Sequence, residues 1–224
     1  MSDYVLSCES TVDLTPEKIQ ELGLECIFFH FYIDGVEYAD DLGQTIPFDK
    51  FYQAMKDGAE TKTAAIGTGE YEKFFRGFFE QGKDVLHVSL SSGISGTVES
   101  ARIAAESLAD EFPDRKIYII DSLAASSGYG LLMQALSEKR AEGMSLDELS
   151  EWAEAHKLHD WHWFFSTDLT FYIKGGRVKP LSGFVGSMLG ICPLLNMDSL
   201  GRLIPREKIR SKKKVIKRIV EKME

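Results

Sequence analysis

The 224-residue sequence contains little cysteine and no long apolar run. Its three cysteines, Cys8, Cys26 and Cys192, stand apart from one another without any paired spacing. A disulfide framework is therefore not expected, and a reducing compartment suits the composition. No stretch approaches the ~20 apolar residues that span a bilayer. The amino-terminal residues also lack the basic and apolar regions of a secretory signal. These features predict a cytoplasmic protein that is not inserted in a membrane.

Positive charge is scarce in most of the chain. The net charge is −9, which argues against a nucleic-acid partner. Residues 206–224 are the exception, with nine Lys or Arg against three Glu. A helical apolar stripe lies in the same segment and consists of Val215, Ile216, Ile219, Val220 and Met223. We expect a packed surface helix with a solvated basic face. Docking of an acidic partner and binding of DNA are the alternatives.

The usual nucleotide-binding motifs are missing. The chain has no G-x-x-x-x-G-K-[ST], and Gly67-Thr68-Gly69 lacks the third glycine of a dinucleotide fingerprint because position 72 is Glu. Gly93-Ile94-Ser95-Gly96 resembles a nucleophile elbow, but Thr97 stands where the second glycine belongs. No cofactor is expected from these patterns.

Histidine offers little support for metal chemistry. His156, His159 and His162 repeat every three residues, but no carboxylate-rich segment accompanies them, so a metal site is not expected. His30 and His87 lie inside apolar runs, and we interpret both as hydrogen-bonded core residues.

Strand and helix patterns alternate through residue 160. Thr15 followed by Pro16 predicts a helix start, and Ser145 with Glu148 predicts another. Asp34-Gly35 predicts a hairpin turn. Apolar runs predict strands over residues 4–8, 26–33, 85–90 and 116–121. Further helices are expected over residues 47–58, 70–81, from 97 onward and 122–142. This order predicts an α/β fold: a three-layer domain over residues 1–160 with a mainly parallel sheet.

The pattern changes after Trp161. We expect a strand over 163–167, a short apolar helix over 184–189, and a hairpin of 191–197 with 202–205 before the basic helix. Residues 161–224 are therefore predicted to form a second, smaller α+β domain.

Three loops are rich in hydroxyl groups, namely Thr61–Thr68, Ser91–Ser95 and Ser122–Ser127. The middle loop lies between an apolar strand and a helix, whose first N–H groups have no partner within the helix. Loops that follow parallel strands meet at one edge of the sheet, where ligands bind. The loops therefore form an anion pocket, or each hydroxyl only caps its own helix. Both interpretations stay open at this point.

Five segments resemble the motifs of the DegV family, in the family's order. Glu9 stands where the family has Asp, and Ala64, Ala65 and Ile66 replace its Ser-Gln-Pro. The segments are Glu9–Leu14 (family D-S-T-x-D-L), Lys62–Glu70 (K-T-S-Q-P-S-P-G-E), Leu90–Thr97 (the central motif), Ile120–Ser122 and Tyr172–Arg177.

The resemblance implies a two-domain α/β protein that holds a long-chain fatty acid between its domains. By analogy, Thr63 and the Ser91-Ser92-Gly93 loop bind the carboxylate, and Arg177 serves near the site or in docking. Family proteins present the acyl chain to a separate fatty acid kinase subunit and perform no chemistry themselves. The residues leave one alternative, a serine-dependent acyl ester hydrolase or acyltransferase that uses Ser92 or Ser95.

Family members continue past the basic helix into closing strands and a glycine-rich segment with a site histidine. The sequence ends at Glu224, so we expect the second domain to be incomplete here. A tail of about sixteen carbons buries roughly 14 methylenes at ~0.8 kcal/mol each, on the order of 11 kcal/mol before ordering costs. Hydrogen bonds to the carboxylate contribute ~1.5–3 kcal/mol each. The tail would therefore set affinity, and the loop would set orientation.

Overall fold

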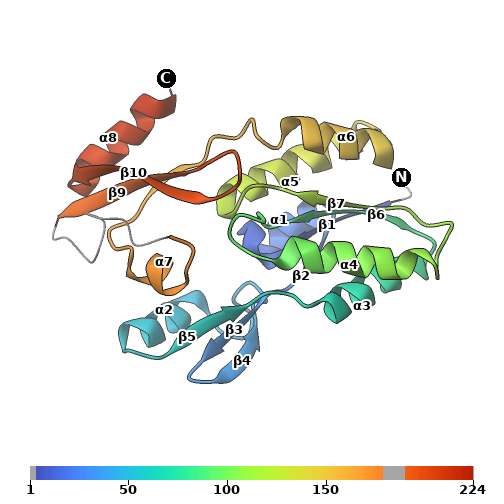
Figure 1. Ribbon diagram of the computed structural model, residues 1–224, viewed down its shortest axis with the longest axis horizontal. Coiled ribbons are helices and arrows are strands. Elements are labelled where there is room, and N and C mark those ends of the chain that lie inside the picture. The colour runs from blue at the N-terminus through green and yellow to red at the C-terminus, as the bar shows by residue number, and fades with distance from the viewer. Residues whose placement is uncertain (1–3, 179–189, 224) are drawn as a thin grey trace. The chain divides into compact units, whose positions relative to one another are not determined.

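The computed structural model describes residues 4–178 and 190–223, shown in Figure 1. The chain forms two compact units, Met1–Lys157 and Leu158–Glu224. A four-stranded sheet in the order β2-β1-β6-β7 lies at the centre of the first unit, and all its pairings are parallel. Its strands are β1 (Tyr4–Glu9), β2 (Leu24–Ile27), β6 (Asp84–Ser89) and β7 (Ile117–Asp121). The predicted α/β class with a parallel sheet is confirmed.

Helices cover both faces of this sheet because the strand side chains alternate in direction. Leu6 and Leu86 pack into one apolar cluster with α1, α5 and α6, whereas Val5 and Val85 pack into another with α3 and α4. Figure 1 shows α5 and α6 on one side of the sheet and α3 and α4 on the other. The helices are α1 (Pro16–Glu21), α3 (Thr68–Phe79), α4 (Thr97–Ala109), α5 (Ser126–Ala141) and α6 (Leu146–His156), with a short 3-10 turn, η1 (Ser10–Val12), after β1.

The helix starts predicted at Thr15 and Ser145 are confirmed, whereas the helix predicted from residue 122 begins at Ser126. Thr15 Oγ1 accepts a hydrogen bond from the Lys18 N–H at 3.2 Å, and Ser145 with Glu148 forms a capping box at the start of α6. Helix α3 buries Tyr71, Phe75 and Phe79, which are four residues apart and therefore lie on one face.

The first unit also contains an antiparallel sheet in the order β4-β3-β5. Two sequence predictions are wrong in this region. Residues 26–33 are two strands and not one, because the buried Phe29 turns the chain: its N–H donates to Ser10 Oγ at 3.1 Å, and its carbonyl accepts from the Asp40 N–H at 2.8 Å. The start of the predicted 61–68 loop is also a strand, since it pairs with β3. The elements of this region are β3 (His30–Ile33), β4 (Val36–Ala39), β5 (Thr61–Ala64) and α2 (Phe48–Lys56).

The hairpin predicted at Asp34-Gly35 joins β3 to β4 and is confirmed. Both turn residues have positive φ, 48° and 83°, which is the geometry of a type I′ turn that matches the twist of its strands.

The second unit contains an antiparallel sheet in the order β10-β9-β8. The hairpin predicted about residues 198–201 is confirmed, but its second strand continues to Arg210. Of the predicted apolar stripe, Val215 is buried against Cys192 and Leu194, whereas Met223 is 81% exposed. The helix predicted over 184–189 lies outside the described residues. The elements are β8 (Trp163–Phe165), β9 (Ile191–Met197), β10 (Leu203–Arg210), α7 (Thr170–Lys174) and α8 (Lys212–Met223).

Candidate functional site

The chain leaves the neighbouring strands β1 and β6 toward opposite faces of the parallel sheet. Strand β1 leads to α1 on one face, and β6 leads to α4 on the other. In parallel α/β sheets such a reversal opens a crevice beyond the carboxyl ends of the strands, where ligands bind. Glu9, Ser89 and Asp121 end β1, β6 and β7, so their side chains are placed at this edge.

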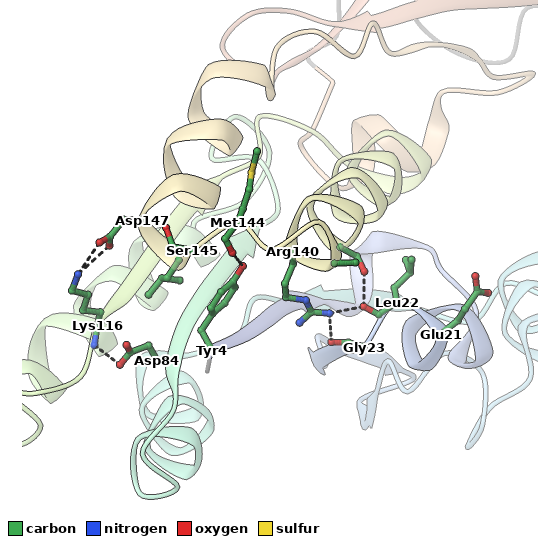
Figure 2. A pocket seen from close by; sticks show the side chains of 14 residues that line it. Tyr4, Glu21, Leu22, Gly23, Asp84, Lys116, Arg140, Met144, Ser145 and Asp147 are labelled. Atoms are coloured by element: carbon green, nitrogen blue, oxygen red, sulfur yellow. Dashed lines mark hydrogen bonds and ion pairs between the residues drawn. The ribbon is translucent and has the colours of Figure 1, made fainter. Parts of the chain in front are cut away.

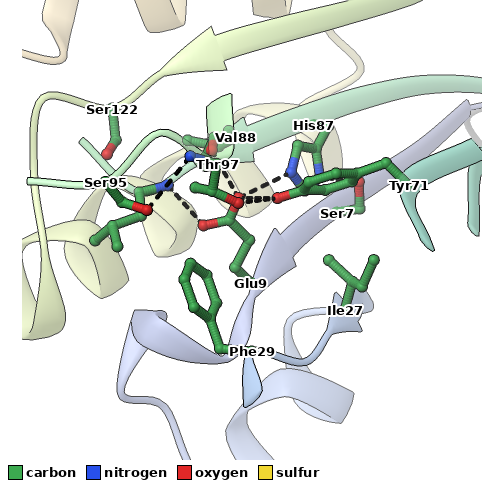
Figure 3. A network of polar contacts seen from close by, with 12 residues as sticks. Ser7, Glu9, Ile27, Phe29, Tyr71, His87, Val88, Ser95, Thr97 and Ser122 are labelled. Atoms are coloured by element: carbon green, nitrogen blue, oxygen red, sulfur yellow. Dashed lines mark hydrogen bonds and ion pairs between the residues drawn. The ribbon is translucent and has the colours of Figure 1, made fainter. Parts of the chain in front are cut away.

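A buried carboxylate lies at this carboxyl edge of the sheet. Ser89 Oγ donates to Glu9 Oε1 at 2.6 Å, the Leu90 N–H donates to Oε2 at 2.8 Å, and the Tyr71 hydroxyl also donates to Oε1. Figure 3 shows Glu9 with Tyr71, Thr97 and His87 close to its carboxylate. Burial, and then the negative charge of Glu9, raise the pKa of Tyr71, which keeps the phenol protonated as a donor. Glu9 is therefore an acceptor whose side chain connects β1 to β6 and α3.

Alternation along the strands gathers further polar residues on the same face as Glu9. Ser7 pairs with His87 across β1 and β6, and both are fully buried. His87 Nδ1 is 2.9 Å from Ser7 Oγ, and its Nε2 is 3.5 Å from Glu9 Oε1. Among the described residues, Nε2 has no hydrogen-bond partner. His87 is thus a core residue, as expected, but only half of its hydrogen-bonding capacity is used.

The other core histidine prediction is wrong. His30 is partly exposed, and its Nε2 lies 2.6 Å from Glu70 Oε1 while its Nδ1 lies 3.2 Å from Glu37 Oε1. The two carboxylates hold the imidazole near the surface, between β4 and the first turn of α3.

The loop Leu90–Gly96, here called the serine loop, follows β6. The N–H groups of Leu90, Ser91 and Ser92 donate to Glu9, to the Ala124 carbonyl at 3.1 Å and to Asp121 Oδ1 at 3.1 Å. The next three N–H groups bond within the loop. Gly93 donates to Ser91 Oγ at 3.0 Å, and Ile94 and Ser95 donate to the Ser91 carbonyl at 3.1 Å. These six loop N–H groups are therefore already occupied, whereas the hydroxyl-bearing Ser92 is exposed.

The hydroxyl-rich loop after β7 lies beside the serine loop. Asp121 accepts both the Ser92 and the Leu123 N–H at 3.1 Å, so one carboxylate connects the two loops. Ser122 Oγ bonds to both backbone groups of Ala124, at 3.1 and 3.2 Å. Ser122 therefore closes a local turn and does not cap α5, whose N-cap residue is Ala125. Two of the three predicted loops meet at the sheet edge.

The remaining predicted ligand-binding residues are Thr63 and Arg177. Thr63 is exposed on β5, opposite Phe31 in the antiparallel sheet. Ile66, three residues later, is buried in the same cluster as Leu90, which connects this segment to the serine loop. Arg177 is exposed in the second unit, where its guanidinium donates to the Gly175 carbonyl. Ser91, Ser92 and Gly93 follow β6 at the carboxyl edge of the parallel sheet, with Ser91 buried and Ser92 exposed.

Glu9 and Tyr71 were not predicted as site residues. The available signal was an acidic residue at the end of an apolar strand, one residue after Cys8. Its burial could not be read from the sequence because the donors come from β6 and α3, more than sixty residues away.

Across residues 4–178 and 190–223, no group of three or more His, Cys, Asp or Glu side chains is arranged to hold a metal ion. His156 Nδ1 instead lies 2.8 Å from the Trp152 carbonyl, and the two rings stack. No helix in this part of the chain is both long and apolar enough to cross a membrane.

A hollow of about 1000 Å³ lies at the opposite, amino edge of the parallel sheet, and Figure 2 shows its lining. Arg140 donates from Nη2 to the Leu22 and Gly23 carbonyls at 2.7 and 2.9 Å, and burial lowers the pKa of its guanidinium. Lys116 Nζ lies 2.9 Å from Asp147 Oδ2. These charged groups are therefore already paired within the protein, where they connect helices α5 and α6 to the segments before β2 and β7. For this reason we place the candidate site at the serine loop and not in this hollow.

Comparisons with known proteins agree with this architecture. The family model described as "Uncharacterised protein, DegV family" matches residues 6–224. A DegV domain-containing protein of Streptococcus pyogenes is 34% identical over 221 residues, covering 99% of this chain and 77% of the relative.

Solved structures show the same fold. One is a DegV family protein from Thermus thermophilus that is described by its fatty acid binding. It is 28% identical to this chain with a TM-score of 0.85, and the match covers 98% of this chain and 76% of that protein. The Streptococcus pneumoniae Fatty Acid Kinase (Fak) B3 protein, loaded with linoleic acid, has a TM-score of 0.85 at 23% identity, with 100% of this chain covering 78% of it. The latter likeness concerns the fold. Given a family match that extends over nearly the whole sequence, this chain belongs to the DegV family.

Proposed function

We propose that the protein binds a long-chain fatty acid with its carboxylate on the serine loop and presents that carboxylate to a separate fatty acid kinase. One observation carries the proposal: each N–H from Leu90 to Ser95 is hydrogen-bonded within the protein, so the loop is ordered, and the exposed Ser92 presents its hydroxyl at the carboxyl edge of the sheet. Ser91, beside it, is buried.

The surroundings of the loop suit a ligand that is polar only at one end. Leu90 and the half-buried Ile94 belong to the same apolar cluster as Phe29 and Ile66. Hydroxyl donors to a carboxylate contribute ~1.5–3 kcal/mol each, whereas a long tail contributes on the order of 11 kcal/mol. The tail then supplies most of the affinity, and the serine loop selects a carboxylate and orients it.

Related proteins support the ligand class. The Thermus thermophilus relative is described by fatty acid binding, and a 27% identical Thermotoga maritima relative, with a TM-score of 0.86, is described as a lipid binding protein. Thr63 and Arg177 enter the proposal on the family motifs alone. The kinase partner is its finer part, and the name of the Streptococcus pneumoniae protein supports it.

In this proposal the chemistry belongs to the kinase. A carboxylate oxygen attacks the γ-phosphorus of ATP, the bond to the β–γ bridging oxygen breaks, and acyl phosphate and ADP are formed. The protein holds the carboxylate of the bound fatty acid in a fixed position and buries the tail away from water.

Denaturing mass spectrometry of purified protein tests the ligand. We expect release of a fatty acid of about 14–18 carbons, a length at which tail burial dominates affinity. Protein that is repeatedly lipid-free and takes up no added fatty acid contradicts the proposal. For the partner, a fatty acid kinase with ATP should convert the bound ligand to an acyl phosphate, trapped by hydroxylamine as a hydroxamate. The protein with ATP and without kinase is the control.

A further inference from the structure

We infer that Glu9 is the positioning residue of this site, because its carboxylate holds both ends of the serine loop in place before a ligand binds. The inference rests on the proposed fatty-acid site. It adds a residue that touches no ligand and acts through the backbone of the residues that do.

The first end of the loop is held directly. The Leu90 N–H donates to Glu9 Oε2 at 2.8 Å, and Leu90 is the residue immediately before Ser91. Glu9 and Ser89 are fully buried, and Leu90 is 7% exposed. Removal of the acceptor would leave a buried N–H without a partner, which favours a shift of the loop backbone.

The second end is held through Tyr71. The Tyr71 hydroxyl donates to Glu9 Oε1, and its oxygen lies 2.8 Å from Oγ1 of Thr97, the first residue of α4. Because the only phenolic proton goes to Glu9, the Thr97 hydroxyl must donate to Tyr71. The buried side chains of Glu9 and Tyr71 thus connect the first residue of the loop, Leu90, to the residue after it, Thr97.

Glu9 is itself fixed from the opposite face of the sheet. Its N–H donates to the Tyr129 hydroxyl at 3.1 Å, and that hydroxyl donates to the Val88 carbonyl. Tyr129 belongs to α5 and is fully buried. The position of the carboxylate is therefore set by β1, β6 and α5, independently of any ligand.

The role depends on the hydrogen bonds that Glu9 accepts more than on its charge. Glu9→Leu removes both the charge and the acceptor oxygens but keeps a side chain of similar length. Glu9→Gln removes only the charge: its oxygen can accept from Leu90, and its amide can donate to the Tyr71 and Ser89 hydroxyls, which can rotate. A purely electrostatic role predicts tighter binding in both variants, because loss of a buried negative charge strengthens binding of an anion nearby.

The experiment combines two measurements on wild type, Glu9→Leu, Glu9→Gln and Tyr71→Phe. Hydrogen–deuterium exchange of residues 90–97 reports loop order without ligand, and calorimetric titration with a long-chain fatty acid gives Kd. We expect faster exchange and about tenfold or greater weakening for Glu9→Leu and Tyr71→Phe, and Glu9→Gln within about threefold of wild type. Tyr4→Phe is the matched control, because its hydroxyl donates to the Met144 carbonyl at 2.9 Å at the other sheet edge (Figure 2).

The outcomes separate the two proposals. Wild-type exchange and Kd in Tyr71→Phe and Glu9→Leu overturn the positioning role, as does an equal loss of affinity in Tyr4→Phe. Wild-type protein that binds no fatty acid overturns the proposed function. In that case the exchange data alone decide whether Glu9 orders the loop.

Discussion

The hydroxyl oxygens of Tyr71 and Thr97 lie 2.8 Å apart in the interior of the first unit. The Tyr71 hydroxyl donates its hydrogen bond to Glu9, so the Tyr71–Thr97 contact connects α3 and α4 to β1. The phenol must stay neutral to act as this donor. Both residues are fully buried. The order of the serine loop therefore depends on a tyrosine that keeps its proton.

Tyr71 and Tyr129 should not ionise in the native protein. Burial and then the charge of Glu9 raise the pKa of both phenols, whereas an unfolded tyrosine titrates near 10. Their contribution to stability is therefore complete below pH about 10 and is lost as the pH rises above it, since the unfolded state then releases protons that the native state keeps. Absorbance titration should show fewer than the eight tyrosines ionising before unfolding. Ionisation of all eight with unchanged circular dichroism would contradict this.

Ser92→Ala should weaken fatty-acid binding and leave the fold intact. The side chain is exposed, so its removal leaves no cavity. The lost hydrogen bond to a carboxylate corresponds to about a 10- to 150-fold rise in Kd. Ser107→Ala is the matched control. Ser107 lies in a later turn of α4, away from the serine loop, and its Oγ donates to Glu72 Oε1 of α3 at 2.6 Å. An unchanged Kd in Ser92→Ala would remove this residue from the site.

Asp121→Ala should disorder the serine loop from the side of β7. The change removes the acceptor of the Ser92 and Leu123 N–H groups, at a cost of about 1–3 kcal/mol for each donor left unpaired. Leu123 also has positive φ, 52°, and loses a contact that holds it there. We expect faster exchange at residues 91–93 and weaker binding, with Asp121→Asn intermediate.

Asp198→Ala provides the comparison for Asp121→Ala. In the β9–β10 hairpin, Asp198 Oδ1 also accepts two N–H groups, those of Leu200 and Arg202, each at 3.0 Å. This change should lower stability without altering exchange in the serine loop. Equal exchange in the two variants would mean that Asp121 has no specific role at the loop.

The three thiols should differ in reactivity. A hydrogen bond with Cys26 and then burial raise the pKa of the Cys8 thiol, and Cys192 is buried, whereas Cys26 is partly exposed. Because the thiolate is the reactive form, a disulfide reagent should label Cys26 first and the other two only on unfolding. Mass spectrometry of the labelled peptides measures this order. Rapid labelling of Cys8 in the native protein would refute it.

A chromogenic acyl ester should not be hydrolysed. The buried His87 contacts Ser7 and Glu9, and the hydroxyl of Ser95 accepts the Thr97 N–H at 3.3 Å. A nucleophilic serine requires a base within hydrogen-bond reach. Release of the chromophore by wild type, abolished in Ser92→Ala, would restore the hydrolase alternative.

The local elements and the family were accessible from the sequence alone. The caps at Thr15 and Ser145, the Asp34-Gly35 turn and the strand before Ser91 each depend on residues close in the chain, so a short window contains their cause. The parallel sheet followed from the alternation of such elements, and the serine loop was found because its hydroxyls follow a buried strand directly.

Only the tertiary structure decided which donors meet which acceptors. The break at Phe29 depends on Ser10 and Asp40, and β5 exists because β3 pairs with it. Glu9 has its role because the β1–β6 pairing brings Ser89 and Leu90 to its carboxylate and α3 brings Tyr71. Local sequence determines whether a residue can accept a hydrogen bond, whereas long-range packing determines which donor it receives and whether water can compete for it.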